Sequence, residues 1–202
     1  MMSHPSPATA RGGQATPRGS PLGVAMAQAK ALPTEVVADL RTDHAGETGA
    51  VCIYRGVLQF ARDPGLRAFA QRHLATEQAH LDQINAWLPK ANRSRLIPVW
   101  RLAGWLTGAL PTLAGPRAVY ATIEAVETFV DQHYEEQVHR LTAHPELRSL
   151  RQTLLECQGD EVAHRDEAAA AQGPDRAGVL LRAWCWLVGV GSKQAVGICR
   201  HI

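Results

Sequence analysis

The feature that most constrains the fold is a glutamate and histidine pattern that occurs twice. Glu77-x-x-His80 lies in HLATEQAHLDQINAW, and Glu161-x-x-His164 lies in QGDEVAHRDEA. Residues three, four and seven apart share one helix face. The neighbours on these faces are Ala70, Leu74, Leu81 and Ile84 for the first pair, and Leu150, Leu154, Cys157 and Ala168 for the second. A carboxylate among such neighbours loses hydration at high cost unless something compensates it.

A single glutamate precedes each pair by about one helix. Glu47 lies 30 residues before Glu77, and Glu127 lies 34 residues before Glu161. The chain therefore contains two copies of one helix-pair plan. Packing the copies about a pseudo-twofold axis brings four carboxylates and two imidazoles together. Four buried carboxylates cannot all stay ionised without a counter-charge, which two divalent cations supply.

This pattern predicts a metal centre with six ligands: Glu47, Glu77, His80, Glu127, Glu161 and His164. Two single glutamates and two Glu-x-x-His pairs, each on a helix of its own, are typical of ferritin-like di-iron and di-manganese proteins. Mixed carboxylate and imidazole ligation favours iron or manganese over zinc.

Other polar residues lie close to the predicted ligands. Asp43 and Asp160 could each orient a ligand imidazole, or be ordinary surface charges. His44, His133 and Tyr134 lie close enough along their helices to line the approach to the metals. Tyr134 shares the stripe of Glu127 and is equally compatible with the core.

Proline, glycine and capping residues divide the chain into four long helical segments. Helices are predicted from residue 34 to the Pro-Gly pair at 64–65, and over about 66–88, 116–142 and 145–171. Hydrophobic residues make up 46% of the chain and aromatic residues only 5%, which suits packed helices better than a β-sandwich. We therefore predict an all-α, ferritin-like four-helix bundle with one long crossover.

Two segments combine tryptophan, aliphatic and basic residues: the crossover over 90–116 and the C-terminal segment 176–202. All 19 acidic residues lie between 35 and 82 or between 124 and 175, so neither segment contains one. This composition suits the surface of an anionic bilayer; a cover over the bundle or a dimer contact is the alternative. The chain contains no run of 18 uncharged apolar residues, so a membrane-spanning helix is not expected. We predict a bundle over 34–175, with the crossover and an amphipathic C-terminal helix at the membrane interface.

The remaining features bear on compartment and partners. Residues 1–33 are predicted to be a disordered tail, and Arg11 and Arg18 without acids permit either a transit peptide or a bacterial tail. The four cysteines form no Cys-x-x-Cys pair and indicate reduced thiols. A net charge of +2 does not indicate a nucleic-acid partner.

Four stretches resemble, in order and spacing, motifs of the demethoxyubiquinone hydroxylase family: RTDHAGETGAVCIYRG, EQAHL, AVETFVDQHYEEQ and DEVAHRDEA. The resemblance covers about residues 35–202. It implies a ferritin-like bundle whose two irons are held by the same six residues. The third motif reads QHY where the family often has HHY, so His133 and Tyr134 are retained. Thr128 stands where the family can carry a second acid, and we assign Glu127 as the ligand.

The resemblance also implies an activity. It implies a monooxygenase of ubiquinone biosynthesis that hydroxylates the ring of a polyprenylated 6-methoxy-3-methyl-benzoquinol with O2. Electrons would come from NADH, without a dedicated nucleotide domain, because the chain has no GxGxxG motif. The protein would be peripheral on the cytoplasmic face of a bacterial membrane or the matrix face of the mitochondrial inner membrane. The resemblance leaves open whether the protein needs a lipid-binding partner protein and whether it forms a homo-oligomer.

Two alternatives compete with this interpretation. A ferritin- or rubrerythrin-like protein would handle iron or peroxide, but rubrerythrins usually carry a Cys-x-x-Cys module, and storage ferritins lack a tryptophan-rich basic crossover. A metal-free helical scaffold at a membrane would leave six inward-facing acids and imidazoles to coincidence. Iron content separates the scaffold from the other two.

Overall fold

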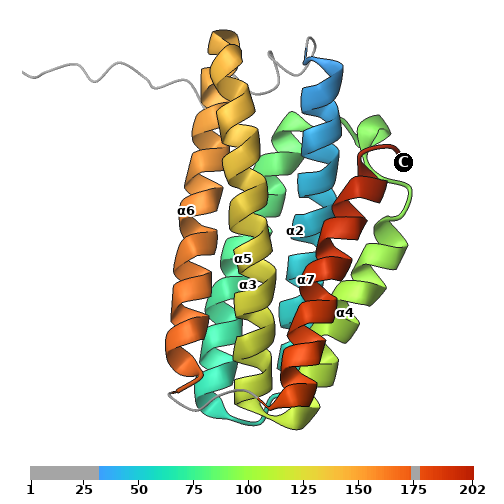
Figure 1. The fold of residues 1–202 in the computed structure, drawn as a ribbon. Helices are drawn as coiled ribbons and strands as arrows, with labels where there is room; N and C mark the ends of the chain where they lie inside the picture. The colour runs from blue at the N-terminus through green and yellow to red at the C-terminus, as the bar shows by residue number, and fades with distance from the viewer. Residues whose placement is uncertain (1–31, 174–177) are drawn as a thin grey trace, which may run out of the picture.

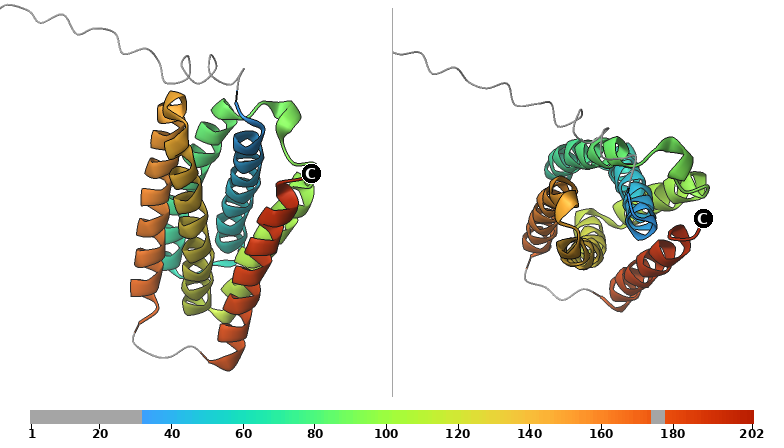
Figure 2. Two further views of the ribbon diagram at one scale, coloured as in Figure 1. Left: turned by 45° about the horizontal axis from the view of Figure 1, so that its top comes forward. Right: turned by 90° about the horizontal axis from the view of Figure 1, so that it is seen from above.

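Two antiparallel helix pairs form the bundle in the computed structural model, which describes residues 32–173 and 178–202 (Figure 1). The first pair is α2 (Thr34–Phe60) and α3 (Pro64–Trp87), and the second is α5 (Pro116–Arg140) and α6 (Arg148–Ala171). Two further helices, α4 (Ile97–Ala114) and α7 (Val179–Cys199), lie together on one side, next to α2 and α5 (Figures 1 and 2). The predicted all-α, ferritin-like bundle is confirmed.

Local sequence signals explain most helix ends. Asp63 caps α3 by accepting a hydrogen bond from the Leu66 N–H at 2.7 Å, and Pro64 occupies the first turn. Gly115, with φ of 105°, separates α4 from α5 in a conformation that other residues adopt at a cost. Between α5 and α6 the chain forms the short 3-10 turns Leu141–Ala143 and Pro145–Leu147, so α6 begins three residues after the predicted start.

The bundle core has two apolar halves. One half, which includes Leu40, Ile84 and Leu150, fills the end where α2 begins and α3 ends. The other, which includes Val57 and Ile123, fills the opposite end. The predicted metal ligands lie between these halves along each helix, so the fold holds a charged layer in an apolar interior.

The crossover is mostly helical. Its short 3-10 turn Lys90–Asn92 leads to α4, which packs against α2 through glycines on both helices. A Cβ at Gly104 would overlap the backbone of Gly49, and one at Gly108 would overlap the backbone of Ile53. The backbones therefore approach closely enough to exclude any side chain at these positions.

Two sequence predictions concern residues at the edges of the described ranges. The predicted disordered tail falls outside those ranges apart from residues 32 and 33, and the boundary at 175–176 falls in the undescribed stretch 174–177. In 32–173 and 178–202, none of the helices is both long and apolar enough to cross a membrane.

Candidate metal centre

The six predicted ligands meet in the middle of the bundle. Each is buried, with at most 4% of its surface exposed. They form two groups in which one ligand atom per residue lies within 4.8 Å of the others: Glu47, Glu77, His80 and Glu161 in one, and Glu77, Glu127, Glu161 and His164 in the other. Glu77 and Glu161 belong to both groups. The geometry is therefore that of two adjacent sites that share two carboxylates.

Each histidine turns its Nδ1 towards carboxylates of both helix pairs. His80 Nδ1 lies 3.1 Å from Glu161 Oε1 and 3.7 Å from Glu47 Oε2. His164 Nδ1 lies 3.1 Å from Glu77 Oε1 and 3.3 Å from Glu161 Oε2. The two imidazoles occupy equivalent places in the two copies of the helix-pair plan.

The cluster cannot ionise all four of its carboxylates at once. Burial raises the pKa of Glu47 and Glu127 well above the usual range, and the charges of Glu77 and Glu161 raise both further. For Glu77 burial acts in the same direction, but the adjacent His164 and His80 outweigh it and lower the pKa to about 2. Two protonated histidines balance only two of the four carboxylates. In the metal-free cluster the other two hold protons, in line with the raised pKa of Glu47 and Glu127, and divalent cations would replace those protons.

Several ligand atoms also lack hydrogen-bond partners. Among the described residues, both side-chain oxygens of Glu77, Oε2 of Glu47, Oε2 of Glu161 and Nδ1 of His164 are buried without an aligned hydrogen bond, although His164 Nδ1 and Glu77 Oε1 are only 3.1 Å apart. Such orphaned polar atoms are costly and rare in folded proteins. Because they converge on shared points instead of pairing, and are carboxylate oxygens and imidazole nitrogens, they fit a pair of divalent cations such as iron or manganese.

Two tyrosines link the copies. Tyr134 donates a hydrogen bond to Glu47 Oε1, and Tyr54 donates one to Glu127 Oε1 at 3.4 Å. Each tyrosine lies seven residues after the single glutamate of its own helix and reaches the glutamate of the other copy. Tyr134 is thus both buried in the core and in contact with the predicted centre. Sequence reasoning missed the role of Tyr54, although the repeated spacing of seven residues was available to find it.

Two further side chains support the histidines. Asp160 Oδ2 lies 3.0 Å from His80 Nε2, as expected of a carboxylate that orients an imidazole. His73 packs edge-on against His164 with ring centroids 4.0 Å apart, and its Nε2 lies 3.1 Å from Glu167. Sequence reasoning did not single out His73, although it lies four residues before Glu77 on the same helix face.

Asp43 and His44 have different surroundings from those expected. Asp43 contacts His133 and Gln137 instead of a ligand imidazole. His44 is buried, and its burial, with the charges of Arg93 and Arg101, lowers its pKa to about 4. It does not belong to the lining of the cavity beside the cluster.

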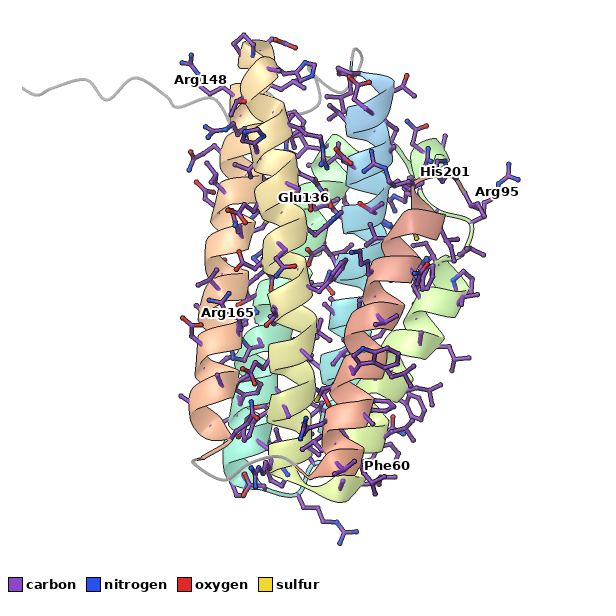
Figure 3. The ribbon with its side chains drawn as sticks, in the orientation of Figure 1. Phe60, Arg95, Glu136, Arg148, Arg165 and His201 are labelled. Carbon is purple, nitrogen blue, oxygen red and sulfur yellow. The ribbon has the colours of Figure 1, made fainter. Side chains whose placement is uncertain are left out.

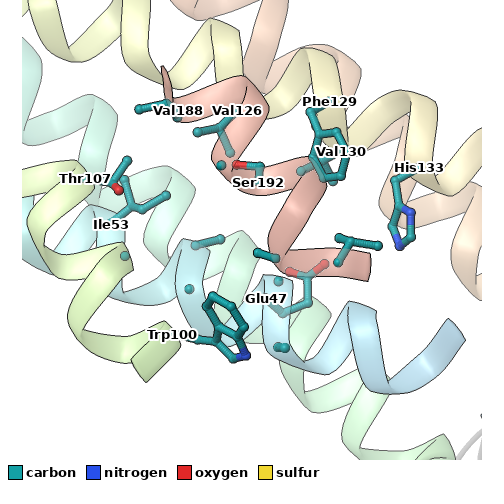
Figure 4. A pocket seen from close by; sticks show the side chains of 18 of the residues that line it. Glu47, Ile53, Trp100, Thr107, Val126, Phe129, Val130, His133, Val188 and Ser192 are labelled. Atoms are coloured by element: carbon teal, nitrogen blue, oxygen red, sulfur yellow. The ribbon is translucent and has the colours of Figure 1, made fainter. Parts of the chain in front are cut away.

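That cavity has a volume of about 390 Å³ and lies between α2, α4, α5 and α7. Its walls are mostly apolar or small side chains, and the four cluster glutamates belong to its lining. In Figure 4, Glu47 lies between His133 at one end and Thr107 at the other. Tyr134 lines the same cavity. The volume is within the range of small-molecule sites.

The bundle and its buried cluster define a class: ferritin-like helical proteins whose glutamates and histidines are placed to hold metal ions. Residues 34–199 match the family model described as "Ubiquinone biosynthesis protein COQ7". The chain belongs to this family.

Named relatives come from eukaryotes and bacteria. The chain is 29% identical to the "NADPH-dependent 3-demethoxyubiquinone 3-hydroxylase, mitochondrial" of Dictyostelium discoideum, over 81% of this chain and 76% of the relative. It is 37% identical to the "3-demethoxyubiquinol 3-hydroxylase" of Rhodospirillum rubrum, over 63% of this chain and 60% of the relative. A relative in Caenorhabditis elegans, named like that of Dictyostelium, is 29% identical over 81% of this chain and 88% of its own length.

Proposed function

We propose that this protein hydroxylates the ring of a polyprenylated demethoxyubiquinol with O2, using two irons held by Glu47, Glu77, His80, Glu127, Glu161 and His164. The observation that carries the proposal is that the cluster glutamates also line a largely apolar cavity of about 390 Å³, a volume typical of small-molecule sites. The names of the relatives support the choice of substrate and reaction.

The irons, when bound, supply the electrons and open coordination positions needed to activate O2. The proposed electron source is a reduced nicotinamide, either NADH or the NADPH that names several relatives. The apolar walls bind the ring and exclude water, which protects reactive species from side reactions.

The residues around the cluster prepare it to bind metal. Asp160 accepts a hydrogen bond from His80 Nε2–H, and with that nitrogen protonated the Nδ1 lone pair of His80 would be the one that faces a bound metal. Tyr134 and Tyr54 each hold one oxygen of a single glutamate, Glu47 or Glu127, and fix its direction. Glu77 and Glu161 belong to both ligand groups and would be shared, whereas Glu47 and Glu127 belong to one group each.

Complementation tests this function in cells. In a strain blocked at the ring hydroxylation, expression of the wild-type chain is expected to restore ubiquinone and consume the accumulated demethoxyubiquinone. A well-expressed wild-type protein that leaves the precursor unchanged would contradict the proposed function.

We also propose that the protein docks on a lipid surface through α4 and α7. Their exposed apolar side chains include Val99, Leu102, Leu106, Leu110 and Leu113 on α4, and Leu180, Trp186, Leu187 and Val190 on α7. Exposed Arg101, Arg182 and Lys193 accompany them on these two helices, which carry no acid. The acidic residue labelled in Figure 3, Glu136, lies on α5. Because the same two helices line the cavity, a substrate with a lipid tail would enter from the bilayer.

Replacing two exposed leucines tests this docking. Leu102→Glu with Leu113→Glu places two negative charges on an apolar surface and is expected to weaken binding to anionic liposomes by about tenfold or more. Cosedimentation measures the binding. The matched control, Gln152→Glu with Ala169→Glu, adds the same charges on exposed positions of α6 and should bind like the wild type. Equal binding by both double variants would exclude this face as the docking surface.

A further inference from the structure

One end of the cavity contains a buried carboxylate outside the metal-ligand cluster. Asp43, on α2, lines the cavity, and its side chain is 0% exposed. Its Oδ1 accepts a hydrogen bond from Gln137 Nε2 at 2.6 Å. Its Oδ2 is buried and has no hydrogen-bond partner among the described residues. A carboxylate oxygen in this state has an unused acceptor position.

The neighbours of Asp43 fix which oxygen is available. The Gln137 amide has two hydrogens: one points to Asp43 Oδ1, and its nitrogen also lies 2.7 Å from His133 Nε2. Thr42 Oγ1, which donates to Asp39 O at 2.6 Å, lies 3.0 Å from His133 Nε2. These contacts hold Oδ1 in place, so Oδ2 is the free oxygen. Burial raises the pKa of Asp43, and the contacts with His133 and Gln137 oppose that rise.

From this arrangement we propose that Asp43 determines substrate specificity by accepting, at Oδ2, a hydrogen bond from a ring hydroxyl of the quinol. A quinone has only acceptor oxygens, so it cannot make this bond. Asp43 therefore favours the reduced ring over the oxidised ring. This inference rests on the proposed function, because it assumes that a quinol occupies the cavity.

The position of Asp43 suits this role. It lies four residues before Glu47, which corresponds to about 6 Å along the helix axis. Both residues line the same cavity and share one face of α2. An aromatic ring that reaches the cluster near Glu47 can therefore extend a hydroxyl towards Asp43. The other walls near this end, Phe129 and Val130, offer apolar surfaces to the ring.

The substitution Asp43→Asn tests the role of the acceptor with little change in shape. Gln137 still donates to the remaining oxygen, so the new NH2 group occupies the place of Oδ2 and donates where the carboxylate accepted. The probes are a short-tailed 6-methoxy-3-methyl-benzoquinol and its quinone, titrated calorimetrically under anaerobic conditions. The protein is loaded with Zn²⁺, which has no redox chemistry that could convert one ring into the other.

The wild type is expected to bind the quinol about tenfold more tightly than the quinone, and D43N is expected to lose that preference. Asp82→Asn, the same change at an exposed carboxylate of α3, should keep it. A second measurement needs no variant: the dimethyl ether of the quinol should bind the wild type about tenfold more weakly than the quinol itself.

Each other outcome overturns the inference. A preference for the quinone would mean that Asp43 carries a proton and donates it. If both the wild type and D43N prefer the quinol to the quinone, Asp43 is not the cause of that preference, and the proposed function is unaffected. Failure of the wild type to bind either ring would remove the proposed function as well.

Discussion

Replacing Glu161 by alanine is expected to abolish both metal binding and hydroxylation. Glu161 belongs to both groups of the cluster, so its loss removes a ligand from each site. Substitutions that only support a ligand usually cost 10–100-fold, so the loss of a shared ligand should lower activity by more than about 100-fold. Metal analysis after anaerobic reconstitution should find less than about one iron per chain, against about two in the wild type.

Two comparisons make this prediction specific. Glu156→Ala removes an exposed carboxylate from the same helix and should leave both iron content and activity unchanged. Glu47→Ala removes a ligand from one group only and should retain more iron than Glu161→Ala. If Glu161→Ala still binds two irons per chain, the assignment of Glu161 as a ligand shared by both metals is wrong.

Removal of the metals is expected to destabilise the fold, because the cluster must then protonate buried carboxylates and leave several of its polar atoms without partners. Metal at about 1,000 times its Kd stabilises a folded protein by about 4 kcal/mol. For a chain of this size, that corresponds to a loss of about 8–16 °C in Tm when a chelator removes the metal. Differential scanning calorimetry of the metal-loaded and chelated protein measures the difference. An unchanged Tm would mean that the carboxylates are balanced by something other than metal.

The substitution Glu127→Gln should raise the Tm of the metal-free protein and lower the Tm of the metal-loaded protein. Burial raises the pKa of Glu127 in the folded protein, so the metal-free fold favours the protonated side chain. The stability that this proton provides is present below the usual glutamate pKa of about 4.3 and is lost as the pH rises towards the folded value. Glutamine is neutral at every pH, so it should raise the Tm of the metal-free protein at neutral pH. In the metal-loaded protein it removes a ligand and should lower the Tm.

If Glu127→Gln changed the Tm in the same direction in the metal-free and the metal-loaded protein, a metal-ligand role for Glu127 would be contradicted. Glu124→Gln provides the control, because Glu124 lies one turn earlier on α5 and is not part of the cluster. It should leave the difference between the two forms unchanged.

The sequence predicted the six cluster positions because helical periodicity fixes which side chains face inward. The repeat then indicates that two sets of three residues face each other. The first set is Glu47, Glu77 and His80, and the second is Glu127, Glu161 and His164. Helix ends were less predictable: Pro145 suggested a helix start, but the chain forms a 3-10 turn there before α6 begins at Arg148.

The cavity was beyond the reach of the sequence. It exists because α4 and α7 lie against α2 and α5, and an isolated helix does not reveal which face another helix will cover. Trp100 and Trp184 illustrate the difficulty. The tryptophans of their two segments contributed to the prediction of a membrane surface, and the structure shows that these two line the cavity. The exposed apolar residues of α4 and α7 are mostly leucines, with Trp186. The free oxygen of Asp43 likewise depends on Gln137 from another helix.

A single-turnover reaction with ¹⁸O2 tests the central claim most directly. Protein reconstituted anaerobically with two ferrous ions is mixed with a short-tailed demethoxyubiquinol and then exposed to ¹⁸O2, and the product is measured by mass spectrometry. We expect up to one hydroxylated ring per chain, with one ¹⁸O atom on the ring. No hydroxylated product from protein that holds two irons, or a hydroxyl oxygen derived from water, would contradict the account.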